Sequence, residues 1–385
     1  MALVVPSYYP EVFGGAERQA KILSQALGRL GMDVTLIAPA LQASTALCEP
    51  AEFGRVVRLR VRSLPANGGR NLLSTLSWVR QAKALARSIP PFDFVYIFHA
   101  RLHALAGLEI ARIHQAPAYI KLGGQGGTSD FAALRAKRFG YGDWTLQQVL
   151  RRTAVFVANS SEIEQDLLAE GVEPERILAL PNGAELPPLY RLQERRHEEG
   201  VARLLFAGRL SAGKRVDLLL HALAQARARG AAATLTFLGD GPERGPLQRL
   251  THELRLKDAV RFEGFTPDTL PAFLDHEFFV SASQNEGQSN ALLEALASGC
   301  IPIVAPASGA RALVQSGRTG ILCERGDAAD FADAFVQAAA LPLTERRRWS
   351  EAGRRLAEET LSIEYVAREI LSAFAPKALC AGDKP

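Results

Sequence analysis

The sequence predicts an α/β protein with two domains, each built around a parallel β-sheet. Short β-branched or apolar runs alternate with amphipathic helical stretches along the whole chain, and this alternation is typical of βαβ units. The chain has 385 residues, more than a single ordinary hydrophobic core would hold. The alternation occurs independently before and after about residue 190, so we expect each half to form its own sheet.

The expected strands are residues 3–5, 34–38, 94–98, 118–122, 155–159 and 177–180 in the first half, and 204–207, 234–238, 260–262, 278–282, 301–305 and 320–323 in the second. Between the halves, residues 186–200 combine two adjacent prolines with a charged run that has little apolar periodicity. We interpret this stretch as the connection between domains. The first domain is therefore expected over residues 1–186 and the second over residues 187–361.

The composition excludes several classes of protein. The 45 basic and 41 acidic residues give a net charge of only +4, which does not support a dedicated nucleic-acid binder. The four cysteines, Cys48, Cys300, Cys323 and Cys380, are too scattered for a disulfide framework or a zinc site. The apolar run at residues 1–6 is too short for a signal peptide and has no basic leader, and no apolar run reaches the roughly 20 residues of a membrane span. We expect a cytoplasmic protein without a nucleic-acid partner.

The most informative segment is a buried strand over residues 278–283, followed by a loop and then a helix over residues 290–297. Glu286 lies on the loop and Glu294 on the helix, where ligands of parallel sheets bind. Carboxylates accept hydrogen bonds from sugar and ribose hydroxyls without a metal. Two glutamates at this spacing are, taken alone, more often surface residues. The apolar helix around Glu294 weighs against that alternative, because a buried carboxylate needs partners.

Backbone N–H groups and cations complete a candidate anion site. Gly287, Gln288 and Ser289 precede the helix, and their N–H groups suit a diphosphate. Arg209 and Lys214 follow the strand over residues 204–207, where they would neutralise a departing diphosphate, although surface cations beside a turn are the commoner case. Three weaker signals follow other strands: Gly14-Gly15, residues 239–243, and residues 262–265.

Taken together, these segments resemble glycosyltransferase family 4, the group 1 retaining glycosyltransferases with the GT-B architecture. The resemblance covers most of the chain and is strongest over residues 154–372. The segments that carry it are residues 159–162, 181–184, 207–209, Lys214, 239–243 and 286–295. It implies two Rossmann-like domains whose parallel sheets face a central cleft, with the donor bound mainly by the second domain and the acceptor mainly by the first. It also implies that residues 362–385 cross back, through a final helix, to the first domain.

The resemblance assigns roles to particular residues. Glu286 matches the glutamate that contacts the donor sugar, and Glu294 matches the glutamate that holds the ribose hydroxyls. Arg209 and Lys214 match the diphosphate-binding pair. The remaining donor-binding residues that it implies are Gly14 and Gly15, which close over the donor, Gly287, Gln288, Ser289 and Asn290, and Gly264, Phe265 and Thr266, which meet the base.

Two positions depart from the family pattern. Many relatives carry a histidine after a first-domain strand, whereas residues 120–130 contain none. Lys121 or Asp130 is the candidate to replace it in orienting the donor or acceptor, and His99 and His103 are interpreted as surface or structural residues. A front-face displacement, in which the departing phosphate takes the acceptor proton, tolerates the loss. The second departure is Arg311, where an acidic residue is common.

The implied activity is transfer of a sugar from a nucleotide-diphosphate sugar, as co-substrate, to a glycan or lipid-linked acceptor in cell-surface polysaccharide or glycoconjugate biosynthesis. No Asp-x-Asp occurs in the sequence, so we expect no metal or other cofactor and activity that survives EDTA. Two alternatives remain: a sugar-nucleotide epimerase or phosphorylase on the same scaffold, and a non-catalytic sugar-nucleotide sensor.

A peripheral contact with the inner, cytoplasmic face of the membrane is a further expectation. Residues 135–141 join cations to aromatic side chains on the expected acceptor domain, and Arg151-Arg152 follows. Such a segment suits anionic headgroups if the acceptor is lipid-linked. A solvated helix face is the alternative.

Overall fold

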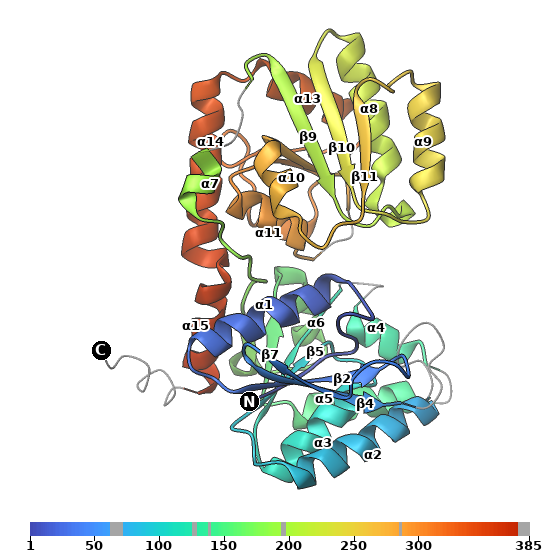
Figure 1. Ribbon diagram of the computed structural model, residues 1–385, viewed down its shortest axis with the longest axis vertical. Helices are drawn as coiled ribbons and strands as arrows, with labels where there is room; N and C mark the ends of the chain where they lie inside the picture. The colour runs from blue at the N-terminus through green and yellow to red at the C-terminus, as the bar shows by residue number, and fades with distance from the viewer. Residues whose placement is uncertain (62–71, 125–128, 138–139, 194–197, 285–286, 376–385) are drawn as a thin grey trace, which may run out of the picture. The chain divides into compact units, whose positions relative to one another are not determined.

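The computed structural model describes residues 1–61, 72–124, 129–137, 140–193, 198–284 and 287–375, and the chain divides into two compact units (Figure 1). Unit 1 comprises Met1–Gly183 together with Ile363–Pro385, and unit 2 comprises Ala184–Ser362. Each unit contains a sheet of mainly parallel strands with helices on both faces. The predicted α/β class with two parallel sheets is confirmed.

Within the described residues, unit 1 forms an eight-stranded sheet in the order β3-β4-β2-β1-β5-β6-β7-β8. Neighbouring strands are parallel apart from β3 and β4, which are antiparallel. Central β1 pairs Leu3 with Leu36 on one side and with Tyr96 on the other. The strands are β1 (Ala2–Val4), β2 (Val34–Ala40), β3 (Cys48–Ala51), β4 (Gly54–Arg60), β5 (Val95–Phe98), β6 (Ala118–Lys121), β7 (Val155–Ala158) and β8 (Ile177–Ala179).

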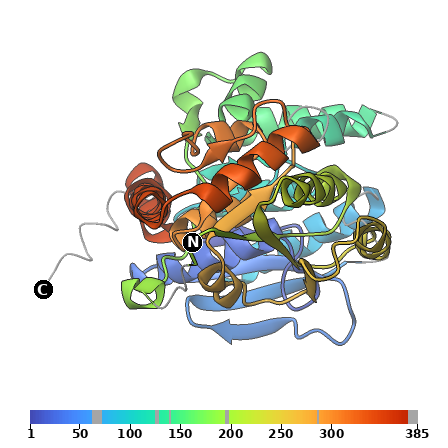
Figure 2. The same ribbon diagram turned by 90° about the horizontal axis from the view of Figure 1, so that it is seen from above.

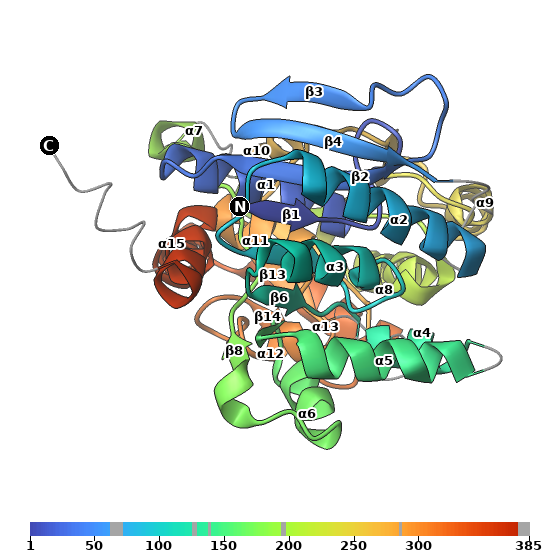
Figure 3. The same cartoon turned by 90° about the horizontal axis from the view of Figure 1, so that it is seen from below.

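Strands β3 and β4 were not expected from the sequence. Figure 3 shows them at one edge of the unit 1 sheet. The β3 sequence, Cys-Glu-Pro-Ala, contains a proline, which an edge strand tolerates because its outer N–H groups need no partner. In β4, arginines interrupt the apolar run. Tertiary pairing, rather than an apolar sequence, therefore makes these two segments strands.

The helices of unit 1 cover both faces of its sheet. On one face α2, α3 and α5 lie side by side (Figure 3). On the other, α1 contacts the final helix, α15, whose Phe374 ring stacks on Tyr119 with centroids 3.6 Å apart. The helices are α1 (Gly15–Arg29), α2 (Leu72–Ser88), α3 (Ala104–His114), α4 (Asp130–Arg135), α5 (Tyr141–Arg152), α6 (Ser161–Ala169), the 3₁₀ turn η3 (Pro174–Arg176) and α15 (Ile363–Phe374).

Unit 2 forms a six-stranded, wholly parallel sheet among its described residues, in the order β11-β10-β9-β12-β13-β14. Its central strand, β9, pairs with β10 over its whole length. Every one of these strands was expected from the apolar runs. They are β9 (Val201–Ala207), β10 (Ala232–Leu238), β11 (Val260–Gly264), β12 (Phe278–Ser281), β13 (Ile301–Val304) and β14 (Ile321–Leu322).

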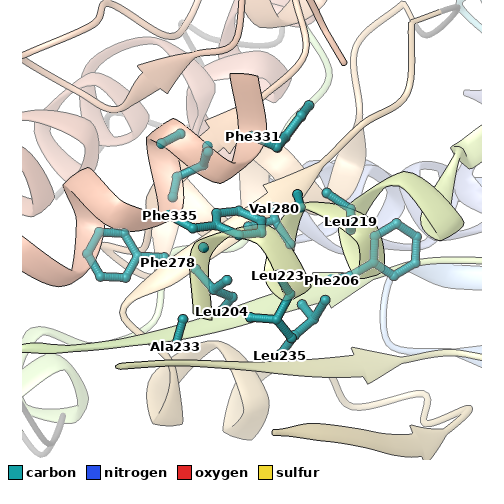
Figure 4. Packing of buried hydrophobic residues seen from close by; sticks show 14 of the residues in the cluster. Leu204, Phe206, Leu219, Leu223, Ala233, Leu235, Phe278, Val280, Phe331 and Phe335 are labelled. Carbon is teal, nitrogen blue, oxygen red and sulfur yellow. The ribbon is translucent and has the colours of Figure 1, made fainter. Parts of the chain in front are cut away.

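Helices α8 and α13 contact each other on one face of this sheet, as the view from above shows (Figure 2). Figure 4 shows the core beneath them, where Leu204 and Phe278 from the sheet meet Leu223 and Phe335 from the helices. The helices are α7 (Leu189–Gln193), the 3₁₀ turn η4 (Ala212–Lys214), α8 (Val216–Ala228), α9 (Arg244–Glu253), α10 (Leu270–Asp275), α11 (Asn290–Ala297), α12 (Ser308–Arg311), α13 (Ala328–Ala340), α14 (Leu343–Leu356) and the π-helical turn η5 (Ala357–Leu361).

One residue of the charged run at the start of α14 is not on a solvated face. Arg346 is 1% exposed, and its Nη1 donates to Glu277 Oε2 at 2.8 Å. The same guanidinium also donates to the carbonyl oxygens of Val201 and Ala338, at 2.9 and 3.1 Å. Arg346 therefore joins the start of β9, the end of α13 and the segment before β12 through charge-assisted hydrogen bonds.

No helix in the described part of the chain combines the length and apolar character needed to cross a membrane.

Candidate functional site

Three strand exits of unit 2 are hydrogen-bonded to one another. Gly208 N, after β9, donates to Leu238 O at 2.9 Å, and Gly239 N, after β10, donates to Gly264 O of β11 at 2.7 Å. Gly239 has a φ of +141°, and a Cβ atom there would come within 3.0 Å of Gly208 O. Glycine is required at this position both by backbone conformation and by close approach. The turns after β9, β10 and β11 are therefore joined by backbone hydrogen bonds into one continuous layer, although two of them are only weak signals in the sequence.

Two cations lie in and beside this layer. Arg209 directly follows Gly208 and is exposed, and it has no hydrogen-bond or ion-pair partner among the described residues. Its neighbour Leu210 donates from N to Asp240 O at 3.0 Å, which fixes the backbone on which Arg209 stands. Lys214 ends η4, and Arg215, the N-cap residue of α8, separates it from that helix. Both cations therefore follow the carboxyl end of the central strand, as the sequence predicts.

Glu294 is held from the exit of β11. The Thr269 hydroxyl, just before α10, donates to Glu294 Oε2 at 2.7 Å. This contact places the Glu294 carboxylate beside the segment that contains Gly264, Phe265 and Thr266. Gly264 has a φ of +78°, and the Phe265 side chain is 58% exposed. Glu294 is therefore hydrogen-bonded to the segment between β11 and α10, to which Phe265 and Thr266 also belong.

The segment before α11 begins that helix as expected. Ser289 is the N-cap residue, in an extended conformation, and its carbonyl accepts from Leu293 N at 3.2 Å. The chain before it is close to α12, because a Cβ atom on Gly309 would come within 3.0 Å of Gly287 O. Gln288 and Asn290 are half-buried at this helix end. Glu286, the predicted contact of the donor sugar, lies outside the described residues.

In unit 1, helix α1 begins at the predicted Gly14–Gly15 pair. The first turn of this helix contains a carboxylate, Glu17, that was not expected from the sequence. Gly14 is the N-cap residue, and a Cβ atom on it would come within 3.0 Å of Glu17 Oε2. Glu17 is buried and accepts a hydrogen bond from the Ser7 hydroxyl. A carboxylate at a helix N-terminus is favoured by the helix dipole. Beside Gly14 and Gly15 it provides an acceptor for hydroxyl groups.

Lys121, one of the two acceptor-side candidates, is the last residue of β6. It is 6% exposed, and its Nζ lies 5.9 Å from the centroid of the Phe98 ring. Burial disfavours the charged ammonium and lowers the pKa of Lys121 to about 7. Burial therefore favours the neutral amine of Lys121 more than it would be favoured in an exposed lysine.

Asp130, the other candidate, is fully buried at the first position of α4. Its Oδ2 accepts from the backbone N–H groups of Ala100 and Gly123, at 3.0 and 2.9 Å, and lies 3.2 Å from His99 Nδ1. Its Oδ1 accepts from Arg101 Nε at 2.7 Å. Burial alone would raise the pKa of this carboxyl, but His99, Arg101 and the Gly123 N–H outweigh it and hold that pKa well below its usual range.

The Asp130 carboxylate is engaged by four neighbouring groups of unit 1, and its part in orienting the donor or acceptor stays a prediction. His99, interpreted from the sequence as a surface or structural residue, is one of those groups. The sequence feature that could have identified His99 as a site residue is its position directly after strand β5, at the carboxyl edge of the sheet.

Two other residues singled out in the sequence have structural roles. His103 is buried, stacks on Trp78 with ring centroids 5.6 Å apart, and donates from Nε2 to Phe98 O. Burial lowers the pKa of His103 to about 4, which keeps it neutral. Arg311 forms a two-pronged ion pair with Glu324, at 2.6 and 3.1 Å, on the surface of unit 2. The described residues contain no group of three or more His, Cys, Asp or Glu side chains placed to hold a metal ion.

Solved structures share the architecture of this chain. Anabaena HepE, in complex with UDP and glucose, aligns over 97% of this chain and 98% of its own, with a TM-score of 0.72 and 17% sequence identity. Two parallel α/β units that follow such a structure throughout, with glycine-rich strand exits, define a GT-B fold.

Family models match both units. The model described as Glycosyltransferase Family 4 matches residues 13–186, and the model described as Glycosyl transferases group 1 matches residues 192–356. The chain belongs to glycosyltransferase family 4, among the group 1 glycosyltransferases, as the sequence motifs indicate.

Two curated relatives differ in how much of the chain they cover. A GDP-mannose-dependent alpha-mannosyltransferase of Mycobacterium tuberculosis is 28% identical over 92% of this chain and 91% of its own length. The lipopolysaccharide core biosynthesis glycosyltransferase LpsE of Rhizobium meliloti is 32% identical over 157 residues, which is 41% of this chain and 46% of that protein.

Proposed function

We propose that this glycosyltransferase is a retaining, metal-independent enzyme that moves a sugar from a nucleoside-diphosphate sugar to a glycan or lipid-linked acceptor. The observation that carries the proposal is the hydrogen-bonded layer at the carboxyl edge of the unit 2 sheet. It combines Arg209, the Gly208–Gly239 approach and the Gly264 exit, and the Thr269–Glu294 hydrogen bond lies beside that exit.

Each part of this layer suits one part of a nucleotide sugar. Arg209 and Lys214 stabilise the negative charge that grows on the departing diphosphate. The Glu294 carboxylate accepts hydrogen bonds from the two ribose hydroxyls. Gly287, Gln288 and Ser289, before α11, offer N–H groups at a helix N-terminus, and Gly264, Phe265 and Thr266 lie where a base is met by main chain. Glu286 completes the proposal as the contact of the donor sugar.

The relatives support the class of donor and acceptor. HepE binds UDP and glucose, and the mycobacterial relative is named as GDP-mannose-dependent. LpsE is named for lipopolysaccharide core biosynthesis, which supports a role in cell-surface polysaccharide synthesis. A cytoplasmic location, with peripheral contact at the inner membrane face, stays a prediction. Arg135 pairs with Glu170 and Arg152 pairs with Glu109, so part of the predicted basic surface is neutralised.

A thermal-shift panel tests the donor site. Wild type and Glu294→Ala are heated with UDP-, GDP-, ADP- and dTDP-sugars in the presence of EDTA. We expect one nucleotide class to raise the wild-type Tm, and the variant to lose that rise. A rise that appears only after Mn²⁺ or Mg²⁺ is added would contradict metal independence. No rise under either condition would contradict the donor site.

Transfer itself is tested by release of nucleoside diphosphate. We expect release to increase when a sugar acceptor is added, and Arg209→Ala to lower kcat by about 100-fold, the effect of removing one group that stabilises transition-state charge. Arg249→Ala, which removes an exposed arginine from α9, is the matched control and should leave kcat unchanged. Release that ignores acceptor, or equal effects of the two substitutions, would contradict the proposal.

A further inference from the structure

The strand exit that lacks a histidine in its sequence holds a histidine ring from the neighbouring strand. Gly123 follows β6, and a Cβ atom on Gly123 would come within 3.0 Å of Cε1 and Nδ1 of His99. His99 follows β5, and its backbone N donates to Lys121 O at 2.7 Å. The ring of His99 thus fills the space in which a side chain at position 123 would begin.

His99 is held in place by its backbone and by Asp130. Its φ is +69°, an uncommon conformation that histidine adopts more readily than most residues. Asp130 Oδ2 lies 3.2 Å from His99 Nδ1 and also accepts from Gly123 N at 2.9 Å. One buried carboxylate therefore ties together the two strand exits. A carboxylate oxygen only accepts, so Nδ1 is the nitrogen that donates in this contact, and Nε2 is the ring nitrogen that Asp130 does not contact.

Nε2 of His99 is the nitrogen that remains for a ligand. The His99 side chain is 23% exposed, and Nε2 has no partner among the described residues. Other partly buried histidines differ. His114 accepts from Phe92 N and donates to Ala86 O, and His276 contacts Ala272 O and Thr236 Oγ1, so both ring nitrogens are used in each. His99 combines an anchored nitrogen, an available nitrogen and a place at the carboxyl edge of the sheet.

We propose that His99, oriented by Asp130 and with its ring in the space that Gly123 leaves open, is the residue that contacts the reacting hydroxyl of the acceptor through Nε2. This inference rests on the proposed function. Nε2 accepts a hydrogen bond from the hydroxyl and so directs its oxygen lone pair. In the transfer, the bond from the anomeric carbon to the diphosphate oxygen breaks and a bond to the acceptor oxygen forms. The acceptor proton, already hydrogen-bonded to Nε2, passes to that nitrogen as the new bond forms and from there to the departing diphosphate, so His99 relays the proton and keeps none in the net reaction.

The first test replaces the ring while keeping the backbone. Asparagine tolerates the positive φ and can still bond Asp130, but it does not reach the position of Nε2. Release of nucleoside diphosphate is followed with the donor found in the thermal-shift panel, with methyl α-glucoside and methyl α-mannoside as acceptor probes and with water alone. We expect His99→Asn to slow release by about 100-fold, the cost of a misplaced reacting group, with the donor-induced Tm rise unchanged. His221→Asn, at an exposed site on α8, is the matched control.

The second test moves the histidine. Because the His99 ring occupies the space beside Gly123, His99→Gly opens that space, and Gly123 has no positive φ that would strain a side chain. We expect the double variant His99→Gly/Gly123→His to recover at least tenfold over His99→Gly alone. A merely structural role for His99 would not be restored by a ring that starts from another strand.

The possible outcomes distinguish a failure of the role proposed for His99 from a failure of the proposed function. His99→Asn within threefold of wild type, or a double variant no faster than His99→Gly, would overturn the role of His99 while leaving the donor site intact. A wild type that binds none of the donors would overturn the proposed function, and the inference with it. A 100-fold loss, an unchanged donor-induced Tm rise and recovery in the double variant together support it.

Discussion

The hydroxyl of Thr269 donates a 2.7 Å hydrogen bond to Oε2 of Glu294, and this contact joins α11 to the exit of β11. The two residues are 25 positions apart in the sequence. Apart from Asn290 at its start, the rest of helix α11 is apolar, with buried Leu292, Leu293 and Leu296, so the carboxylate is presented from a well-packed element. A site residue that stands on such an element keeps its position without ligand.

Glu294→Gln should weaken binding of nucleoside diphosphate by roughly 10- to 100-fold, because hydrogen bonds to a charged group contribute about 1.5–3 kcal/mol. Thr269→Val should weaken it by less than tenfold, since it removes one neutral donor from a carboxylate that keeps its charge. Isothermal titration calorimetry with UDP and GDP measures both affinities. An affinity unaffected by Glu294→Gln would remove Glu294 from the donor site.

Gly239→Ala should disrupt the layer of strand exits. The substitution places a Cβ atom within 3.0 Å of Gly208 O, at a φ of +141° that alanine rarely adopts. We expect a lower Tm together with a lost nucleotide-induced Tm rise. Gly245→Ala is the matched control, because Gly245 lies inside α9, where its nearest neighbour is the flexible end of Arg249 and alanine favours the helix. Equal effects of the two substitutions would show that the close approach does not matter.

Lys121 makes stability depend on pH. Its pKa is about 7 in the folded chain and 10.5 in the unfolded one, so between these values the unfolded chain binds more protons. The free energy of unfolding should therefore rise with pH in this window, by up to about 1.4 kcal/mol per pH unit from this group. Lys121→Met removes the contribution. Urea unfolding of both proteins at pH 7 and pH 9 should show the advantage of the variant shrinking at the higher pH. A constant difference would mean that the ammonium is well solvated in the folded chain.

Arg346→Met should destabilise unit 2 by about 3–5 kcal/mol, the usual cost of breaking a buried ion pair by removing one partner. The loss leaves Glu277 and several carbonyl oxygens buried without their donor. Adding Glu277→Gln should restore part of the loss, because the unpaired charge disappears. Urea unfolding of the two single variants and the double variant measures this coupling. Arg348→Met, which removes an exposed neighbour paired with Glu345, should change stability by less than about 1 kcal/mol.

The expected strands show which elements of the fold a local sequence pattern can predict. Apolar runs such as residues 278–282 and 301–305 predicted β12 and β13, because both faces of a central parallel strand are buried and its sequence is continuously apolar. Segment β3 has no such sequence, since it is an exposed edge strand that β4 pairs in antiparallel fashion. Its strand character comes from the neighbour rather than from its own residues.

The sequence by itself determined the α/β class, the family and the candidate donor-binding residues, because these depend on periodicity and on motifs that are local in the chain. The tertiary structure decided which residues meet. It placed the Asp130 carboxylate within hydrogen-bond distance of His99 and Gly123, which are 31 and 7 positions away in the sequence. It also paired Arg346 with Glu277, which is 69 positions away. Hydrogen bonds and burial depend on distance in space, and a charged or polar residue gives no local sign of whether its partner arrives from a distant strand. His99 was interpreted from the sequence as a surface or structural residue for this reason, and only the packed structure placed His99 at a strand exit and Arg346 in the core.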